Sequence, residues 1–400
     1  MLKGIISHYK SSFKGLPRNV WLLSVVVLIN RSGSMVLFFM TLYLTKELNF
    51  SVTEAGQMIS VYGLGAMGGA VLGGWLTDKI GTAKVQALSL FISGIGFILL
   101  NYFETAIEIA LFLFFIAAVH ESFRPANASA LAIAAPPEKR ARAFALNRLA
   151  INLGVTIGPA VGGLLATINY DFLFWADGVT CIAASIFVLY FFNNKMEFRK
   201  TTNRVNVKIG ISPFKDIPYL FMLFLLLIMG SVFVQIFNAY PLYLKSITKF
   251  NEDSIGLLIA LNALLVVLIE MPIVHKVEGS GQLKLMALGS LLFFGGFAIM
   301  PFSNAYLYIA ATVIIWSLGE ILVFPFASSF VANRADENNR GKYMGLFTFS
   351  FALSFIIGPT AGTYIYEKFG PENLWYACGV LGVFVAGGFL LLNNYLNKRN

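Results

Sequence analysis

The chain has 400 residues, of which 58% are hydrophobic and only 12% are charged, with a formal net charge of +9 and a mean hydropathy of +0.75. A soluble globular domain carries about 25% charged residues, so this composition excludes a water-soluble fold and also a disordered chain. The chain therefore has to meet lipid, and its 38 Phe against 5 Trp fit a surface that faces acyl chains.

Apolar runs that can cross a bilayer as helices, which takes about 20 residues each, follow one another along the whole chain. We predict spans at residues 19–45, 54–77, 84–102, 106–135, 143–167, 172–193, 217–244, 254–275, 284–302, 305–332, 342–366 and 373–396. The connections are short, apart from a polar stretch at 194–216 that we interpret as a cytoplasmic linker. The prediction is an all-α membrane protein with twelve transmembrane helices in two six-helix bundles, 1–193 and 217–400.

Most of the basic residues fall in alternate connections. If the N-terminus is cytoplasmic, 23 of the 29 Lys and Arg residues lie in cytoplasmic segments, four lie in outer loops and two lie within spans. This is the positive-inside pattern, and it predicts that both termini are cytoplasmic. The basic balance is thereby explained by topology and by attraction to anionic lipid, so we expect no nucleic-acid partner.

The two halves repeat each other with an offset of 200 residues. Matching positions include Arg140 with Arg340, Gly158-Pro159 with Gly358-Pro359, Gly162 with Gly362, and Trp175 with Trp375. Two parallel six-helix repeats imply a pseudo-twofold axis along the membrane normal, with a site at mid-membrane between the halves.

The connection after the second span contains a short charged motif. It resembles motif A of the major facilitator superfamily, GxLaDrxGrr, which the chain matches at Gly74, Asp78, Lys79 and Gly81. A carboxylate at such a place can pair with a neighbouring cation or a helix N-terminus and separate again when the halves rock. We therefore expect these four residues to act in gating.

The fifth span contains a glycine-rich motif with a central proline. It resembles motif C of the same superfamily, gxxxGPxxGG, at Gly154, Gly158, Pro159, Gly162 and Gly163. Glycines four residues apart permit close helix contact, and a proline adds a kink. A similar glycine face is present in the second span at Gly65, Gly69 and Gly73.

The resemblance extends over nearly the whole chain and is strongest to twelve-helix drug:proton antiporters, in which motif C is typical. It implies alternating access, transport driven by a proton or ion gradient, and a central cavity lined by helices 1, 4, 7 and 10. One feature differs from that type: the stretch at residues 112–118 in the fourth span has no arginine where such antiporters usually carry one.

Five ionisable residues within the spans are the strongest functional candidates, because a charge inside a membrane is costly. Glu320 in the tenth span is the first candidate for the proton-coupling site, and Glu121 in the fourth is the second. Arg31 and Arg124 would hold an anionic group of a substrate or act as counter-ions, and Glu121 and Arg124 share a helix face. Glu270, near the inner end of the eighth span, is a further candidate for substrate binding or gating.

Uncharged polar side chains within the spans complete the predicted substrate site. Those that we expect to shape it are Asn30, Tyr62, Asn127, Asn152, Gln235, Asn238 and Asn262; for each, a hydrogen bond between helices is an equal alternative. Asp177 in the sixth span has no predicted partner and is left outside the site.

The first span supports a second reading. Residues 30–35, Asn-Arg-Ser-Gly-Ser-Met, are similar to the first helix of proton-coupled oligopeptide transporters, although the acidic residues of that motif are missing. The alternative function is therefore a proton-coupled symporter that imports a small zwitterionic or anionic solute such as a peptide.

The main hypothesis is a secondary active transporter, a proton-coupled antiporter that exports small amphipathic or drug-like compounds. We predict no enzymatic activity, because there is no nucleophile–base arrangement, and no cofactor or metal, because Cys and His residues lack ligand spacing. The expected partners are a small-molecule substrate, protons and the lipid bilayer. We expect a monomer that crosses a bacterial inner membrane many times.

Overall fold

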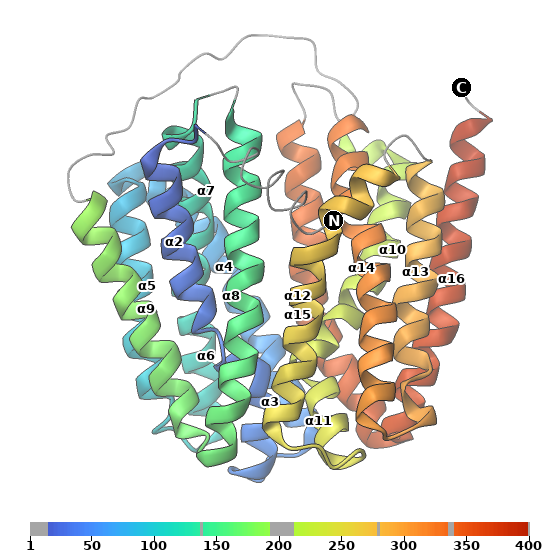
Figure 1. The fold of residues 1–400 in the computed structure, drawn as a ribbon, viewed down its shortest axis with the longest axis horizontal. Helices are drawn as coiled ribbons and strands as arrows, with labels where there is room; N and C mark the ends of the chain where they lie inside the picture. Colours follow the sequence, from blue (N-terminus) through green and yellow to red (C-terminus); the bar gives the residue numbers. More distant parts are fainter. Residues whose placement is uncertain (1–14, 137–138, 193–211, 278–280, 335–339, 399–400) are drawn as a thin grey trace. The chain divides into compact units, whose positions relative to one another are not determined.

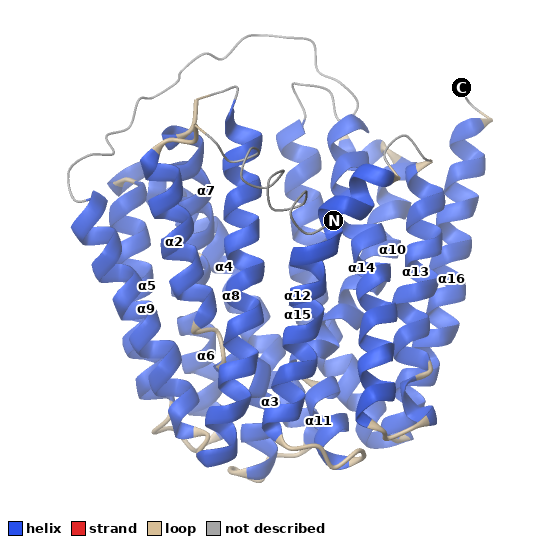
Figure 2. Cartoon of the chain, viewed as in Figure 1, coloured by secondary structure: helices blue, strands red, loops and turns tan. Residues whose placement is uncertain are grey.

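The computed structural model describes residues 15–136, 139–192, 212–277, 281–334 and 340–398 (Figure 1). These residues form helices and loops with no strand among them (Figure 2). In this described part, twelve segments are long and apolar enough to cross a membrane, which confirms the all-α fold and the twelve predicted spans. The predicted linker 194–216 lies outside the described residues as far as residue 211.

The helices follow the predicted spans closely. Those of the first half are α2 (Arg18–Ser32), α3 (Val36–Lys46), α4 (Val52–Ile80), α5 (Thr82–Leu100), α6 (Ala106–Glu121), α7 (Phe123–Ala134), α8 (Arg140–Ile168) and α9 (Asp171–Phe192). Those of the second half are α10 (Ile217–Phe233), η3 (Val234–Phe237), α11 (Ala239–Ser246), α12 (Glu252–Lys276), α13 (Gln282–Ala298), α14 (Tyr306–Arg334), α15 (Arg340–Phe369) and α16 (Pro371–Asn397).

Three spans that hydropathy predicts as continuous are interrupted. The first consists of α2 and α3, separated by residues 33–35, and the fourth consists of α6 and α7, which meet at Ser122. The seventh passes from α10 through the 3-10 turn η3 into α11. Interrupted backbone at membrane depth is tolerated where protein groups satisfy its polar atoms, so each break indicates a local network.

The described helices divide into two compact units, and each is considered by itself. Unit 1 comprises residues 1–36 and 64–200, and unit 2 comprises residues 37–63 and 201–400. Residues 37–63, here called the distal segment, contain α3 and the beginning of α4. They belong to the first sequence repeat but pack with the helices of the second.

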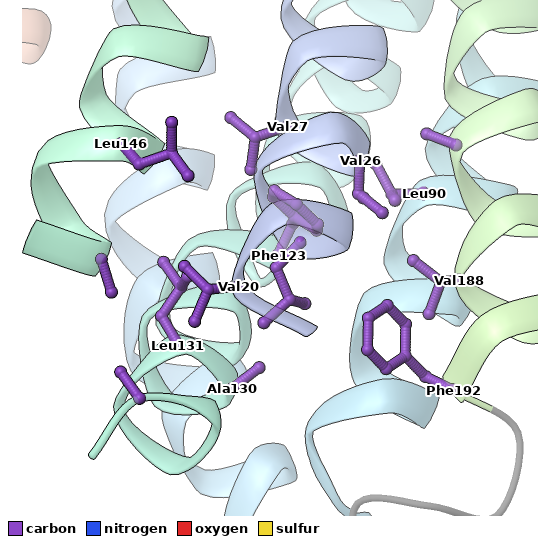
Figure 3. Close-up of a cluster of buried hydrophobic side chains, with 14 of the residues drawn as sticks. Val20, Val26, Val27, Leu90, Phe123, Ala130, Leu131, Leu146, Val188 and Phe192 are labelled. Carbon is purple, nitrogen blue, oxygen red and sulfur yellow. The ribbon is translucent and has the colours of Figure 1, made fainter. Parts of the chain in front are cut away.

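Unit 1 has a core where α2, α5, α7, α8 and α9 meet (Figure 3). Val26 and Leu90 are fully or almost fully buried there, together with Phe123, Val188 and Phe192. Lipid tails are as apolar as these side chains, so close packing and dispersion stabilise the core more than exclusion from water does.

Glycines bring the helices of unit 1 close together. A Cβ atom added at Gly69 of α4 would lie 2.2 Å from the carbonyl oxygen of Ala118, and one at Gly65 would lie 2.2 Å from that of Phe114. The predicted glycine face of the second span is therefore confirmed as a close contact with α6.

Unit 2 is built around stacked aromatic rings. The Phe297 ring of α13 stacks on Trp316 of α14 at 5.2 Å and on Trp375 of α16 at 5.6 Å between centroids. All three side chains are buried. The matched Trp175 of the first repeat is instead exposed, so the sequence repeat does not extend to this stack.

The distal segment is bound to the rest of unit 2 by polar contacts. Lys46 forms an ion pair with Glu252, the Thr53 amide donates to the Glu367 carboxylate at 2.8 Å, and the hydroxyls of Ser60 and Thr360 lie 2.8 Å apart. Gly56 faces Thr363 so closely that an added Cβ would overlap its hydroxyl. These contacts join α3 and the start of α4 to α12 and α15.

Candidate functional site

The predicted acid–base pair of the fourth span is present in unit 1. The Nη1 atom of Arg124 lies 3.3 Å from Oε2 of Glu121, across the junction of α6 and α7. The Glu121 side chain is 11% exposed, whereas that of Arg124 is 69% exposed. The pair therefore places a buried carboxylate beside a guanidinium whose surface is largely accessible to another group.

Arg31 of α2 adds a second positive charge to this region. Its electrostatic influence reaches both Glu121 and His120. His120 itself is buried, and its ring packs edge-on against Phe97 of α5 at 5.6 Å. Unit 1 thus contains a carboxylate, two cations and a histidine within one polar neighbourhood.

The amides predicted for this part of the site lie at different depths. Asn30 is fully buried and donates from Nδ2 to the Cys181 sulfur at 3.4 Å. Asn127 is also buried and donates to Oδ1 of Asn147 at 3.1 Å. Asn152 is half-buried on α8. Asn30 and Asn127 therefore make the contacts between helices that are the alternative to ligand binding.

The motif C helix packs on the break in the first span. A Cβ atom added at Gly154 would lie 2.5 Å from Cβ of Arg31, and one at Gly158 would lie 2.9 Å from the carbonyl oxygen of Ser34. Pro159 lies within α8 without ending it. Two motif C glycines thus let α8 approach the backbone beside Arg31.

In unit 2, Glu320 of α14 is held by a neighbouring amide. Nδ2 of Asn262 on α12 donates to Oε2 of Glu320 at 2.8 Å and to the Ser317 hydroxyl at 3.0 Å. Glu320 and Asn262 are both half-buried. The structure therefore brings together a predicted proton-coupling residue and a predicted substrate-binding residue.

The side-chain amides of Gln235 and Asn238 in the seventh span form hydrogen bonds with backbone groups. Gln235 donates to the carbonyl oxygens of Ser231 at 2.9 Å and of Gly358 at 2.7 Å. Asn238 is fully buried and its Oδ1 accepts from the amide of Ala239, the first residue of α11. These two predicted substrate ligands thus lie inside the protein, where they bind the Ser231 carbonyl and the Ala239 amide beside the break, and Gln235 also reaches α15.

The remaining predicted site residues are Tyr62 and Glu270. Both side chains are buried, Tyr62 on α4 and Glu270 near the end of α12 that leads to residue 276. Their burial fits either a ligand-facing or a helix-packing position.

Motif A forms the turn between α4 and α5. Gly81 has a φ of +92°, a conformation that favours glycine, which explains that residue of the motif. Asp78 is exposed, and the ammonium of Lys79 lies 3.8 Å from the centre of the Trp75 ring. In unit 1 the motif is therefore an exposed charged turn.

A charged cluster at the start of α10 was not anticipated from the sequence. Asp216 receives two hydrogen bonds from Arg334, at 2.6 Å from Nε and 2.8 Å from Nη2, and a third from the Tyr343 hydroxyl at 2.8 Å. Burial by itself raises the pKa of Asp216, but these hydrogen bonds and the charge of Arg334 outweigh it and hold the pKa below its ordinary value. The cluster ties α10, α14 and α15 together at their ends.

The hydrogen-bond partners of Asp177 on α9 were not predicted from the sequence either. Its Oδ2 atom accepts from the backbone amides of Met35 and Val36, at 3.3 Å each. No side-chain pattern could have indicated this contact, because the donors are backbone groups 141 and 142 residues away. The available signal was a single carboxylate in the interior of an otherwise apolar sixth span.

Comparison with known families and relatives agrees with this architecture. The sequence profile described as the Major Facilitator Superfamily matches residues 20–359 and 236–400. The Na(+), Li(+), K(+)/H(+) antiporter of Planococcus maritimus is 23% identical over 402 residues, covering 91% of this chain and 92% of the relative. The multidrug resistance protein MdtH of Aeromonas hydrophila is 22% identical over 390 residues, covering 95% and 96%.

Solved structures share the fold at low sequence identity. A peptide transporter POT in complex with sulfate superimposes with a TM-score of 0.79 at 16% identity and covers 96% of both chains. The nucleoside transporter NupG also gives 0.79, at 14% identity, covering 94% of this chain and 100% of that chain. These likenesses describe the fold, and they do not select a substrate.

Proposed function

The chain belongs to the Major Facilitator Superfamily and is a secondary transporter, and we propose that it is a proton-coupled antiporter that exports small amphipathic or drug-like compounds. The observation that carries this proposal is the hydrogen-bonded Glu320 within α14, a titratable carboxyl in the interior of a membrane span. Motif C and relatives that are named as antiporters or multidrug resistance proteins support the direction of transport.

In this proposal Glu320 binds and releases the coupled proton. Charge inside a membrane is costly, so a carboxyl there exchanges its proton as the polarity around it changes. The amide of Asn262 stabilises the ionised form by donating to Oε2. A substrate that binds at the ionised Glu320 and Asn262 would displace the coupled proton, and a proton that binds to Glu320 would release the substrate, so that the two compete as antiport requires.

In this proposal, arginine and asparagine side chains within the spans recognise the substrate. Arg124 offers a guanidinium that the buried Glu121 covers only partly, and Arg31 adds charge on α2. We propose that Arg31, Arg124, Asn152, Asn262, Tyr62 and Glu270 contribute to substrate binding, with Glu121 as a second proton-binding group. Gln235, Asn238 and Asn30 would shape the site through the helices they hold.

A second candidate is a proton-coupled symporter for a small zwitterionic or anionic solute. The accessible guanidinium of Arg124 favours it, because an anionic group of a solute could bind there. The similar fold of peptide transporters is compatible with this candidate but does not distinguish it.

We further propose a setting for this transporter in a bacterial inner membrane, with both termini cytoplasmic. The distribution of Lys and Arg supports the orientation. The gating role of motif A, through Asp78 and its neighbours, belongs to the same proposal. We also propose that the protein functions as a monomer.

Transport in proteoliposomes with an imposed pH gradient tests these proposals. Cationic dyes and dipeptides are offered side by side. For an antiporter, we expect substrate to move against the direction of proton flow, and accumulation along the proton gradient would overturn the antiport proposal and support symport.

The role of Glu320 is tested by Glu320→Gln in the same assay. This variant keeps a group that can pair with Asn262 but cannot ionise, so we expect gradient-driven transport to be lost while substrate binding is partly retained. Glu104→Gln, at an exposed loop position, is the matched control. Full gradient-driven transport by Glu320→Gln would remove Glu320 as the coupling site.

A further inference from the structure

The first span is broken at residues 33–35, and Asp177 binds the end that the break exposes. The first amides of a helix have no partner within the helix, so α3 begins with unsatisfied donors. Oδ2 of Asp177 accepts from two of them, Met35 and Val36. An anionic side chain at this end of a helix is further stabilised by the helix dipole.

The break is tightly enclosed by the neighbouring helices of unit 1. A Cβ atom at Gly33 would overlap the side chain of Thr180 on α9, and Gly158 of α8 packs against the Ser34 carbonyl oxygen. Asp177 is almost completely buried. The contact between Asp177 and the start of α3 is therefore inside the protein, where a change in charge has a large effect.

The second half provides a natural comparison, because its seventh span is broken at the corresponding place. There Gln235 binds the carbonyl oxygen of Ser231 before the break, and Asn238 binds the amide of Ala239 after it. With the offset of 200 residues, the position of Asp177 is taken by Ala377. The two breaks thus differ in chemistry: one is bound by a group that can titrate, and the other by groups that cannot.

We propose that Asp177 is a further proton-sensitive residue of this transporter, a positioning residue whose ionised carboxylate holds the start of α3 to α9 at the break in the first span. Binding of one proton to the carboxyl removes its charge and weakens both hydrogen bonds to the amides of Met35 and Val36. The start of α3 then separates from α9 more readily.

The charged and titratable groups around Asp177 fit this role. Arg31 of α2 is a cation whose charge reaches Asp177, and Cys181, one turn along α9, places its sulfur 3.8 Å from Oδ1. The α5 helix faces this part of α9 at Gly94, and α8 faces the break with Gly154 and Gly158. Protonation of Asp177 would leave the charge of Arg31 less balanced in the same region.

Hydrogen exchange of the purified protein in lipid nanodiscs tests this inference. Protection factors, corrected for the intrinsic effect of pH, are measured between pH 5 and 9 for a peptide that contains Met35 and Val36. A peptide that spans the second break and contains Ala239 is the control within the same molecule. We expect protection at the first break to fall about tenfold or more as the pH decreases, whereas protection at the second break stays constant.

The variant Asp177→Asn should have low protection at the first break at every pH. A pH dependence equal to that of the wild type in this variant, or parallel changes at both breaks, would overturn the inference. If Asp177→Asn does not fold, Asp177→Glu decides. This variant keeps a carboxyl in a different position, so the pH at which protection of the first break is half lost should change. An unchanged midpoint pH would contradict the role of Asp177.

This inference deepens the proposed proton-coupled function, and the two can fail separately. The exchange measurement needs neither substrate nor gradient. In Glu320→Gln protein, the first break should keep its pH dependence even though coupled transport is lost. Loss of the pH dependence in that variant would assign it to Glu320 and count against Asp177.

Discussion

The Nζ atom of Lys46 lies 2.7 Å from Oε1 of Glu252, although 206 residues separate them in the sequence. The other carboxylate oxygen of Glu252 accepts from Lys245 at 2.8 Å, so one buried acid joins α3, α11 and α12. The Glu252 carboxylate thus binds the distal segment of the first repeat to two helices of the second repeat.

We expect Glu252→Gln to destabilise the protein by about 1–3 kcal/mol, because it leaves two lysines facing each other without their anion. The loss should appear as a lower midpoint of thermal unfolding in detergent. The exposed variant Glu372→Gln is the control and should unfold like the wild type. A double-mutant cycle with Lys46→Met isolates the pair, and a coupling energy near zero would show that Lys46 does not stabilise this contact.

The hydrogen-bonded Asp216 predicts a dependence of stability on pH. The pKa of this carboxyl in the folded protein lies below the ordinary value of 3.8, mainly through the bonds from Arg334 and Tyr343 that outweigh burial. Its contribution to stability is therefore complete above pH 3.8 and is lost as the pH falls through the lower pKa of the folded state. Asp216→Asn should lower the unfolding temperature at pH 6, and the difference from the wild type should shrink in acid. An equal difference at pH 6 and pH 3 would contradict the depressed pKa.

The motif C glycines predict a sharp contrast between substitutions. Gly154→Ala places a methyl group 2.5 Å from Cβ of Arg31, so the helices have to separate, at a cost of about 1–3 kcal/mol. Gly68→Ala in α4 meets open space and should be neutral or slightly stabilising, since alanine favours a helix. Unfolding temperatures of the two variants in the same detergent give the comparison. Equal values would mean that α8 can move away from Arg31 without cost.

Arg124 predicts the charge preference of the substrate. Arg124→Gln should weaken binding of anionic compounds about tenfold and leave cationic compounds little affected, because the exposed guanidinium is removed. Binding to the purified protein by fluorescence or thermal shift measures this difference. Unchanged binding of anions, together with a lower unfolding temperature, would indicate that the pair with Glu121 serves structure alone.

The sequence determined the twelve spans and the pairing of Glu121 with Arg124. Each follows from local chemistry: a bilayer of fixed thickness demands long apolar helices, and residues three apart on a helix are neighbours. It also indicated the glycine faces, because small residues four apart permit close packing wherever another helix lies. These features need no knowledge of which distant segments meet.

Only the tertiary structure decided which partners the isolated polar residues have. Asp177 binds backbone amides of another helix, Asn262 binds Glu320, and Lys46 binds Glu252. At the break at residues 33–35, likewise, the amides of Met35 and Val36 find their acceptor on α9, in Asp177. In a low-dielectric interior each polar group requires a hydrogen-bond partner. The sequence shows which polar residues lie in apolar spans, but the partner of each is decided by the packing of helices that are far apart in the chain.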